Sequence, residues 1–92
     1  MTEFRGKSVQ AMVRDIADGY VSVNPIFLKP FGEEGLKTLY QQVHKIQAEI
    51  RSTPFPTSDV EMIRQRNLKL QRLHGAAIVT KHFARTRRIQ II

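Results

Sequence analysis

One run of apolar residues, spaced alternately three and four positions apart, constrains the fold more than any other feature. Its members are Leu36, Leu39, Val43, Ile46 and Ile50. This rhythm places them all on one seam of an α-helix that packs lengthwise against a second helix. Glu33 and Glu34 suit the positive start of the helix dipole, and Thr53-Pro54 ends the helix. We therefore predict a helix over residues 33–52 with a helical partner beside it.

The partner helix follows after a short turn that contains two prolines. Residues 53–57 read Thr-Pro-Phe-Pro-Thr, which is a stiff connection. Ser58 and Glu61 have the spacing of a capping box, in which hydroxyl and carboxylate satisfy each other's free backbone donors. We predict a long helix over residues 58–86, antiparallel to the first because the loop is short. The shorter helix should cover it only as far as Ile78, which leaves a basic overhang.

The N-terminal third of the chain supplies a cover for this hairpin. One helical stripe contains Val9, Met12, Val13, Ile16 and Tyr20. We predict a helix over residues 8–18, capped by Ser8 and ended by Gly19. Residues 20–31 hold two prolines and the apolar run Ile26-Phe27-Leu28, for which we predict an extended strap laid across the helices. The alternative role of this strap is a hydrophobic docking peptide for a partner.

These elements together predict an all-α fold and a single small domain that spans residues 1–92. The predicted architecture is a short N-terminal helix, an extended apolar strap, and an antiparallel hairpin of two long helices. Hydrophobic residues make up 41% of the chain and charged residues 25%, which is ordinary for a globular domain. A domain of this length buries only about two-thirds of the surface of its unfolded chain, so we expect a thin core.

The composition excludes several classes of protein. The sequence has no cysteine, which rules out disulfides, thiolate metal sites and thiol catalysis. Its apolar runs, such as Pro25–Leu28, are far shorter than the roughly 20 residues that span a bilayer, so we expect no membrane span. The N-terminus lacks the apolar core of a secretory signal, and we therefore expect an intracellular, cytoplasmic protein.

The residues that could carry catalysis do not form a constellation. His44, His74 and His82 lack the i, i+4 spacing that would place two imidazoles on one helical face for a metal ion. Glu33 and Glu34 are adjacent, and neighbouring helical residues point about 100° apart. We therefore predict a binding protein that is not an enzyme and that uses no metal and no cofactor.

The distribution of charge is the strongest functional signal. The chain has 15 Lys and Arg against 8 Asp and Glu, and no acidic residue follows Glu61. Such asymmetry points to a polyanionic partner, and we favour nucleic acid, either DNA or RNA. Contact with the phosphate backbone is better supported than base readout, because the cations are spread around the helix. The predicted polyanion-binding residues are Arg64, Arg66, Lys69, Arg72, Lys81, Arg85, Arg87 and Arg88.

The same helix supports a second hypothesis, which is assembly with other proteins. It is apolar on several sides, as expected for a helix that several neighbours contact. The candidate interface residues are Leu68, Val79, Phe83, Ile89, Ile91 and Ile92. Under this alternative the protein is an oligomeric adaptor or a small subunit of a larger complex. Its basic helix would then meet an acidic protein surface or a second copy of the chain.

Overall fold

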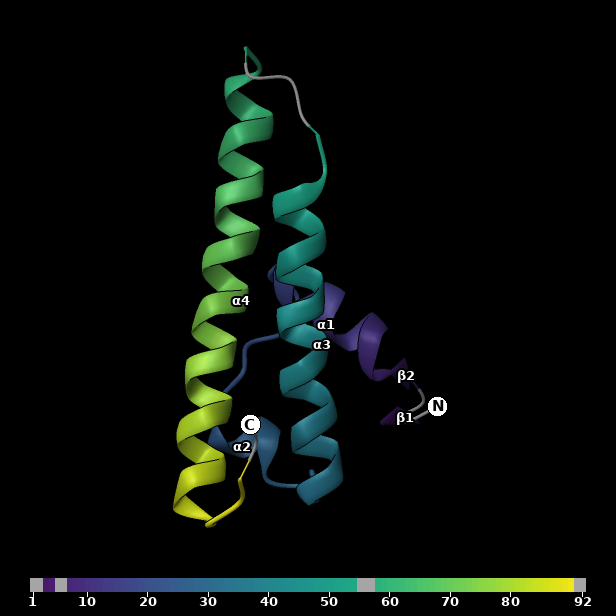
Figure 1. Cartoon of the computed structure of the whole chain (residues 1–92), viewed down its shortest axis with the longest axis vertical. Coiled ribbons are helices and arrows are strands. Elements are labelled where there is room, and N and C mark those ends of the chain that lie inside the picture. The colour runs from purple at the N-terminus through teal and green to yellow at the C-terminus, as the bar shows by residue number, and fades with distance from the viewer. Residues whose placement is uncertain (1–2, 5–6, 55–57, 91–92) are drawn as a thin grey trace.

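The computed structural model describes residues 3–4, 7–54 and 58–90 of the chain. The elements in these ranges are β1 Glu3–Phe4, β2 Lys7–Ser8, α1 Val9–Ala17, α2 Pro25–Leu28, α3 Glu33–Ser52 and α4 Val60–Thr86. The long helices α3 and α4 lie side by side and antiparallel, so the predicted helical hairpin is confirmed (Figure 1). The only addition to the all-α plan in the described ranges is β1 paired with β2, a hairpin of two-residue strands.

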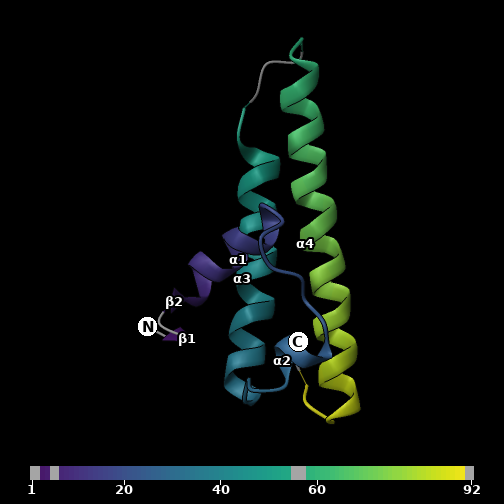
Figure 2. The ribbon, with the colours of Figure 1, turned by 180° about the vertical axis from the view of Figure 1, so that it is seen from behind.

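The core lies where α1 crosses the hairpin (Figure 2). The seam predicted for α3 is buried from Leu36 to Ile46, and Ile50 at its end is half-buried. Helix α1 adds Met12, Val13 and Ile16 to the same cluster. Each fully buried aliphatic side chain contributes about 1.5 to 3 kcal/mol relative to exposure, so α1 is held mainly by this apolar face.

Both predicted ends of α1 are confirmed. The Ser8 hydroxyl oxygen accepts a hydrogen bond from the Ala11 N–H at 3.1 Å and caps the start. At the other end Gly19 has a φ of +86°, in the left-handed region that glycine adopts without steric cost. The Tyr20 N–H donates to the Asp15 carbonyl at 2.9 Å, and the Gly19 N–H donates to the Ile16 carbonyl at 3.1 Å. This pair of bonds is a Schellman motif.

The predicted strap contains a turn of helix, α2, and is not extended throughout. The Asn24 side chain accepts from the Phe27 N–H at 2.9 Å, and Pro25 occupies the first helical position. An Asn cap followed by Pro is a favourable helix start, and it outweighs the tendency of this short segment to stay extended. Leu28 is buried and closes the core, whereas Ile26 is 82% exposed and does not.

The start of α4 differs from the predicted capping box. Its cap is Asp59, whose carboxylate accepts from the Met62 N–H at 3.1 Å. Glu61 does not reach back to Ser58 but accepts from the Gln65 amide at 2.9 Å. Both residues can cap a helix, and a carboxylate gains further stabilisation from the dipole at a helix start.

The two long helices are offset in the direction opposite to the predicted one. At the basic end of α4, Ala84 is 1% exposed, whereas Val60 at the other end is 78% exposed. Figure 1 shows the N-terminal end of α4 extending past the end of α3, while its C-terminal end lies beside the start of α3. Helix α2 also packs on α4 at this end. The basic segment therefore rests on the core and does not overhang the hairpin.

Candidate polyanion-binding surface

Three of the eight predicted cations interact with other residues of the protein. The Lys69 ammonium lies 3.6 Å from a carboxylate oxygen of Asp18. Arg72 donates from Nη1 to the Ala17 carbonyl, the last of α1, at 3.0 Å. Arg66 is half-buried and also interacts with another group of the protein. These side chains lie in the N-terminal half of α4, and two of them fasten α1 to the hairpin.

The C-terminal end of α4 is built differently. The Ile89 N–H donates to the Ala84 carbonyl at 2.8 Å, and the Arg88 N–H donates to the Arg85 carbonyl at 3.0 Å. This is a second Schellman motif, with Arg88 at the position usually taken by glycine. Arg88 accordingly has a φ of +58°, which L-residues rarely adopt. Ile89 packs back against the core and holds the turn in place.

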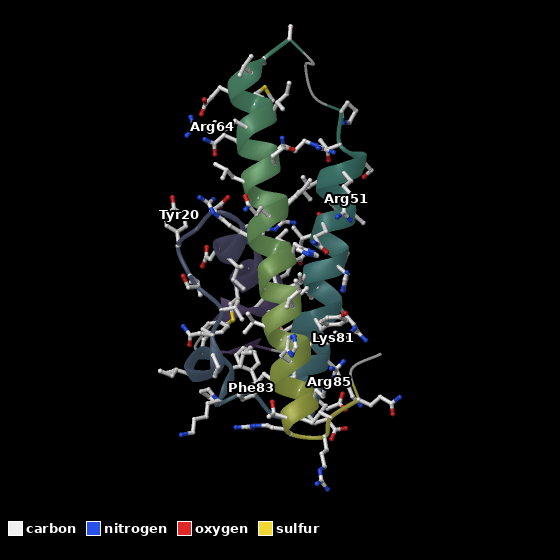
Figure 3. The ribbon with its side chains drawn as sticks, turned by 90° about the vertical axis from the view of Figure 1, so that its left-hand side faces the viewer. Tyr20, Arg51, Arg64, Lys81, Phe83 and Arg85 are labelled. Carbon is white, nitrogen blue, oxygen red and sulfur yellow. The ribbon has the colours of Figure 1, made fainter. Side chains whose placement is uncertain are left out.

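Four cations are exposed at this end, and we call them the C-terminal basic cluster: Lys81, Arg85, Arg87 and Arg88. Lys81 and Arg85 are four residues apart and lie on the same side of α4 (Figure 3). Across residues 3–4, 7–54 and 58–90, no ion pair reaches any member of the cluster. Glu33 and Glu34 begin α3 at the same end, and both lie within 4.0 Å of the Lys37 ammonium.

Arg87 has an aromatic neighbour. Its guanidinium carbon lies 4.5 Å from the centre of the Phe83 ring, a cation–π distance. Phe83 is half-buried and also packs against the core. The guanidinium therefore lies over a ring whose position the core restricts.

Arg64 is exposed but lies apart from the C-terminal basic cluster. It is separated from Lys81 by about 25 Å along the helix axis, given a rise of about 1.5 Å per residue. Figure 3 places the two near opposite ends of α4. The structure thus brings together Lys81, Arg85, Arg87 and Arg88, and it does not join Arg64, Arg66, Lys69 or Arg72 to them.

Most of the candidate interface residues pack against other parts of the same chain. Val79, Phe83 and Ile89 pack against the hydrophobic core, and Leu68 is half-buried. Ile91 and Ile92 lie outside the described residues. Different apolar side chains of α4 are exposed, namely Val60, Met62 and Ile78. Periodicity could not single these out, because α4 carries apolar residues on several sides.

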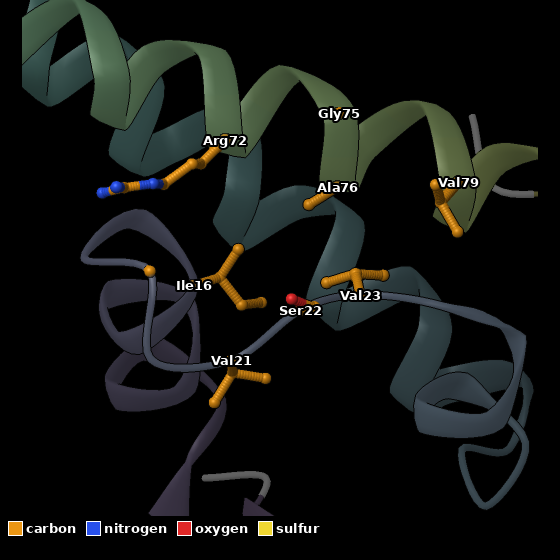
Figure 4. A pocket seen from close by; sticks show the side chains of 9 residues that line it. Ile16, Val21, Ser22, Val23, Arg72, Gly75, Ala76 and Val79 are labelled. Carbon is orange, nitrogen blue, oxygen red and sulfur yellow. The ribbon is translucent and has the colours of Figure 1, made fainter.

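A hollow beside Arg72 lies between the strap and α4 (Figure 4). It has a volume of about 370 Å³, and its apolar walls include Ile16, Val23 and Val79. Figure 4 shows the Arg72 side chain extending over the turn that follows α1 and not into the hollow. The Arg72 guanidinium is thus turned toward the Ala17 carbonyl. The other polar side chain among the lining residues is that of Ser22, and the rest of the depression is apolar.

Comparison with protein-family models, with curated proteins and with solved structures finds no match to this chain. In the part of the chain that the structure describes, no three His, Asp or Glu side chains gather in a way that could hold a metal ion. The same residues include no helix with the length and apolar character needed to cross a bilayer. The exposed cations of α4 remain the feature of the described residues that bears on function.

Proposed function

We propose that this protein binds the phosphate backbone of nucleic acid through the C-terminal basic cluster, as an intracellular binding protein without catalytic activity. One observation carries the proposal: Lys81, Arg85, Arg87 and Arg88 are exposed within the last two turns of α4 and its cap. Phosphate oxygens accept strong charge-assisted hydrogen bonds from arginine. The net charge of +7 would also speed encounter with a polyanion at low salt.

The backbone of Arg88 supports the same proposal. A left-handed conformation costs an L-residue about 1 to 2 kcal/mol, and glycine would avoid that cost at the helix end. Arginine at this position instead projects a cation from a turn that Ile89 anchors to the core. Strained backbone of this kind is concentrated at functional sites.

Binding to phosphates predicts affinity with little sequence preference and steep salt dependence. Four phosphate contacts give a slope of log K against log salt of about −3.6 for duplex DNA and about −2.8 for single strands. We would measure this by fluorescence anisotropy with labelled oligonucleotides between 50 and 300 mM salt.

A matched pair of variants separates the cluster from general charge. The test variant is Arg85→Gln with Arg88→Gln. The control is Lys45→Gln with Arg51→Gln, which removes two exposed cations from α3. We expect the test variant to flatten the duplex slope by about 1.8, because two phosphate contacts are lost. The control should keep the wild-type slope. Equal losses in both variants, or no binding by the wild type near 150 mM salt, would refute the proposal.

The second candidate function is assembly with another protein, either an acidic partner or a second copy of the chain. The exposed apolar side chains of Val60, Met62 and Ile78 favour it. Light scattering on the eluting protein between 5 and 200 μM tests self-association directly. A monomer across this range excludes self-association at these concentrations, whereas a dimer that Ile78→Glu dissociates would support it.

A further inference from the structure

An open groove of about 760 Å³ crosses the C-terminal half of α4 beside the start of α2. Pro25, Val79 and Phe83 give it an apolar floor. Arg85 and Arg87 from the C-terminal basic cluster border the same groove. Apolar and cationic groups therefore meet on one surface, and a fitting ligand must be both apolar and anionic.

The arrangement of Phe83 and Arg87 narrows the chemistry further. The guanidinium of Arg87 lies over the Phe83 ring at 4.5 Å. A guanidinium is planar and stacks on flat aromatic groups while it keeps its charge. Both side chains border the groove and each ends in a planar group, which suits a planar aromatic ligand better than a branched aliphatic one.

We infer that this groove binds single-stranded nucleic acid, with a base stacked on the Phe83–Arg87 pair and the adjoining phosphates on Arg85 and Lys81. This inference rests on the proposed function and names its substrate class. Unpaired bases expose their faces for stacking on aromatic side chains, whereas a duplex hides them. Figure 3 shows Phe83 on one flank of α4 and Lys81 and Arg85 on the other, so the strand would cross the helix.

The charge around the groove also favours a nucleic acid strand. The groove-lining residues His82, Arg85, Thr86 and Arg87 include cations and neutral groups but no carboxylate. The hydroxyl of Thr86 already donates within α4, to the His82 carbonyl at 2.7 Å. The contact to the ligand phosphates thus falls to Arg85, which lines the groove, and to Lys81 on the same side of the helix.

The test compares ligands that carry the same phosphates with and without bases. We would measure the affinity of the full-length protein for a 12-nucleotide thymidine strand, for an abasic strand of equal length, and for a duplex. The wild type should bind the thymidine strand about 5- to 100-fold more tightly than the abasic strand, the range for one stacked base. The two single strands should give the same salt slope, because they carry equal charge.

Two variants test whether the preference for the thymidine strand over the abasic strand comes from Phe83 and Arg87. Phe83→Leu keeps an apolar side chain in the core, and Arg87→Lys keeps the charge but removes the planar group. Both should bring the affinity for the thymidine strand down to that for the abasic strand, with an unchanged salt slope and unchanged duplex affinity. Arg87 is exposed, so the second variant remains informative if the first lowers stability.

The outcomes separate this inference from the proposed function. If the wild type binds thymidine and abasic strands equally while Arg85→Gln with Arg88→Gln still flattens the slope, the stacking inference is wrong and the phosphate proposal stands. If the wild type binds no oligonucleotide near 150 mM salt, both fail. If a polyglutamate peptide displaces the strand and Phe83→Leu weakens both ligands equally, the groove binds acidic polymers in general and the inference is overturned.

Discussion

Replacing Arg72 by methionine should destabilise the whole fold, because this side chain completes the C-terminal end of α1. The last four carbonyls of a helix have no partner inside it. In α1 three of them accept from the backbone N–H groups of Asp18, Gly19 and Tyr20. The fourth, on Ala17, accepts from the Arg72 guanidinium at 3.0 Å. Methionine retains an apolar stem but has no donor, so the Ala17 carbonyl loses its protein partner.

The magnitude follows from the nature of that bond. A hydrogen bond to a charged group contributes about 1.5 to 3 kcal/mol, and a cation at a helix C-terminus adds about 0.3 to 1 kcal/mol. Arg72 is exposed, so water replaces part of the lost interaction. We therefore expect the free energy of unfolding to fall by about 1.5 kcal/mol, at the lower end of this range. For a domain of this size the melting temperature should fall by about 6 to 12 °C.

Urea unfolding followed by circular dichroism measures this difference, with Arg64→Met as the matched control. Arg64 is an exposed arginine of the same helix, and its replacement should change the free energy of unfolding by less than about 0.5 kcal/mol. If both variants unfold at the same urea concentration, the hydrogen bond from Arg72 to the Ala17 carbonyl contributes nothing measurable to the free energy of unfolding. The Lys69–Asp18 ion pair and the apolar face of α1 would then suffice to hold that helix.

Three further predictions test the fold by urea unfolding. Gly19→Ala should lower the free energy of unfolding by about 1 to 3 kcal/mol, because φ is +86° and the new Cβ would lie 3.0 Å from Arg72 Cζ. Leu28→Ala should cost about 2 to 5 kcal/mol, whereas Ile26→Ala should cost less than about 0.5 kcal/mol. Arg88→Gly removes a left-handed cost of about 1 to 2 kcal/mol but adds about 0.5 to 1 kcal/mol of backbone entropy, so it should stabilise the protein by about 0.5 to 1 kcal/mol. It should also flatten the duplex salt slope by about 0.9. A loss of stability in Arg88→Gly would contradict the strain argument.

The parts of the fold that depend on local pattern could be predicted from the sequence. The seam from Leu36 to Ile46 identifies α3 because its spacing allows only one buried face. Gly19 marks the end of α1 because few other residues adopt its φ. The sequence Asn24-Pro25 is also a local helix signal, but the resulting helix α2 has only four residues. Whether this signal outweighs the helix-breaking effect of the neighbouring Pro30 depends on the tertiary contacts of the segment, which the sequence does not contain. The sequence therefore predicts an extended strap.

The offset of the hairpin and the composition of the cluster depend on distant contacts. Helix lengths and a short loop predict a C-terminal overhang, but the strap returns α2 to that end, where Leu28 and Phe31 are buried. Charge counting likewise treats Arg72 and Arg85 as equivalent. Arg72 differs because its partner carbonyl lies 55 residues earlier in the chain. No local pattern records that contact.

The left-handed turn at Arg88 connects stability to the proposed binding. Lys81 and Arg85 belong to a helix whose inner side is fixed by buried Thr80 and Ala84. Arg87 and Arg88 follow the helix end and are held by the Schellman bond from Ile89 to Ala84. A backbone segment that is held in place before binding loses less entropy when a ligand arrives. The affinity of the cluster therefore depends on position as well as charge. Loosening the Ile89 anchor should weaken binding while leaving the number of cations unchanged.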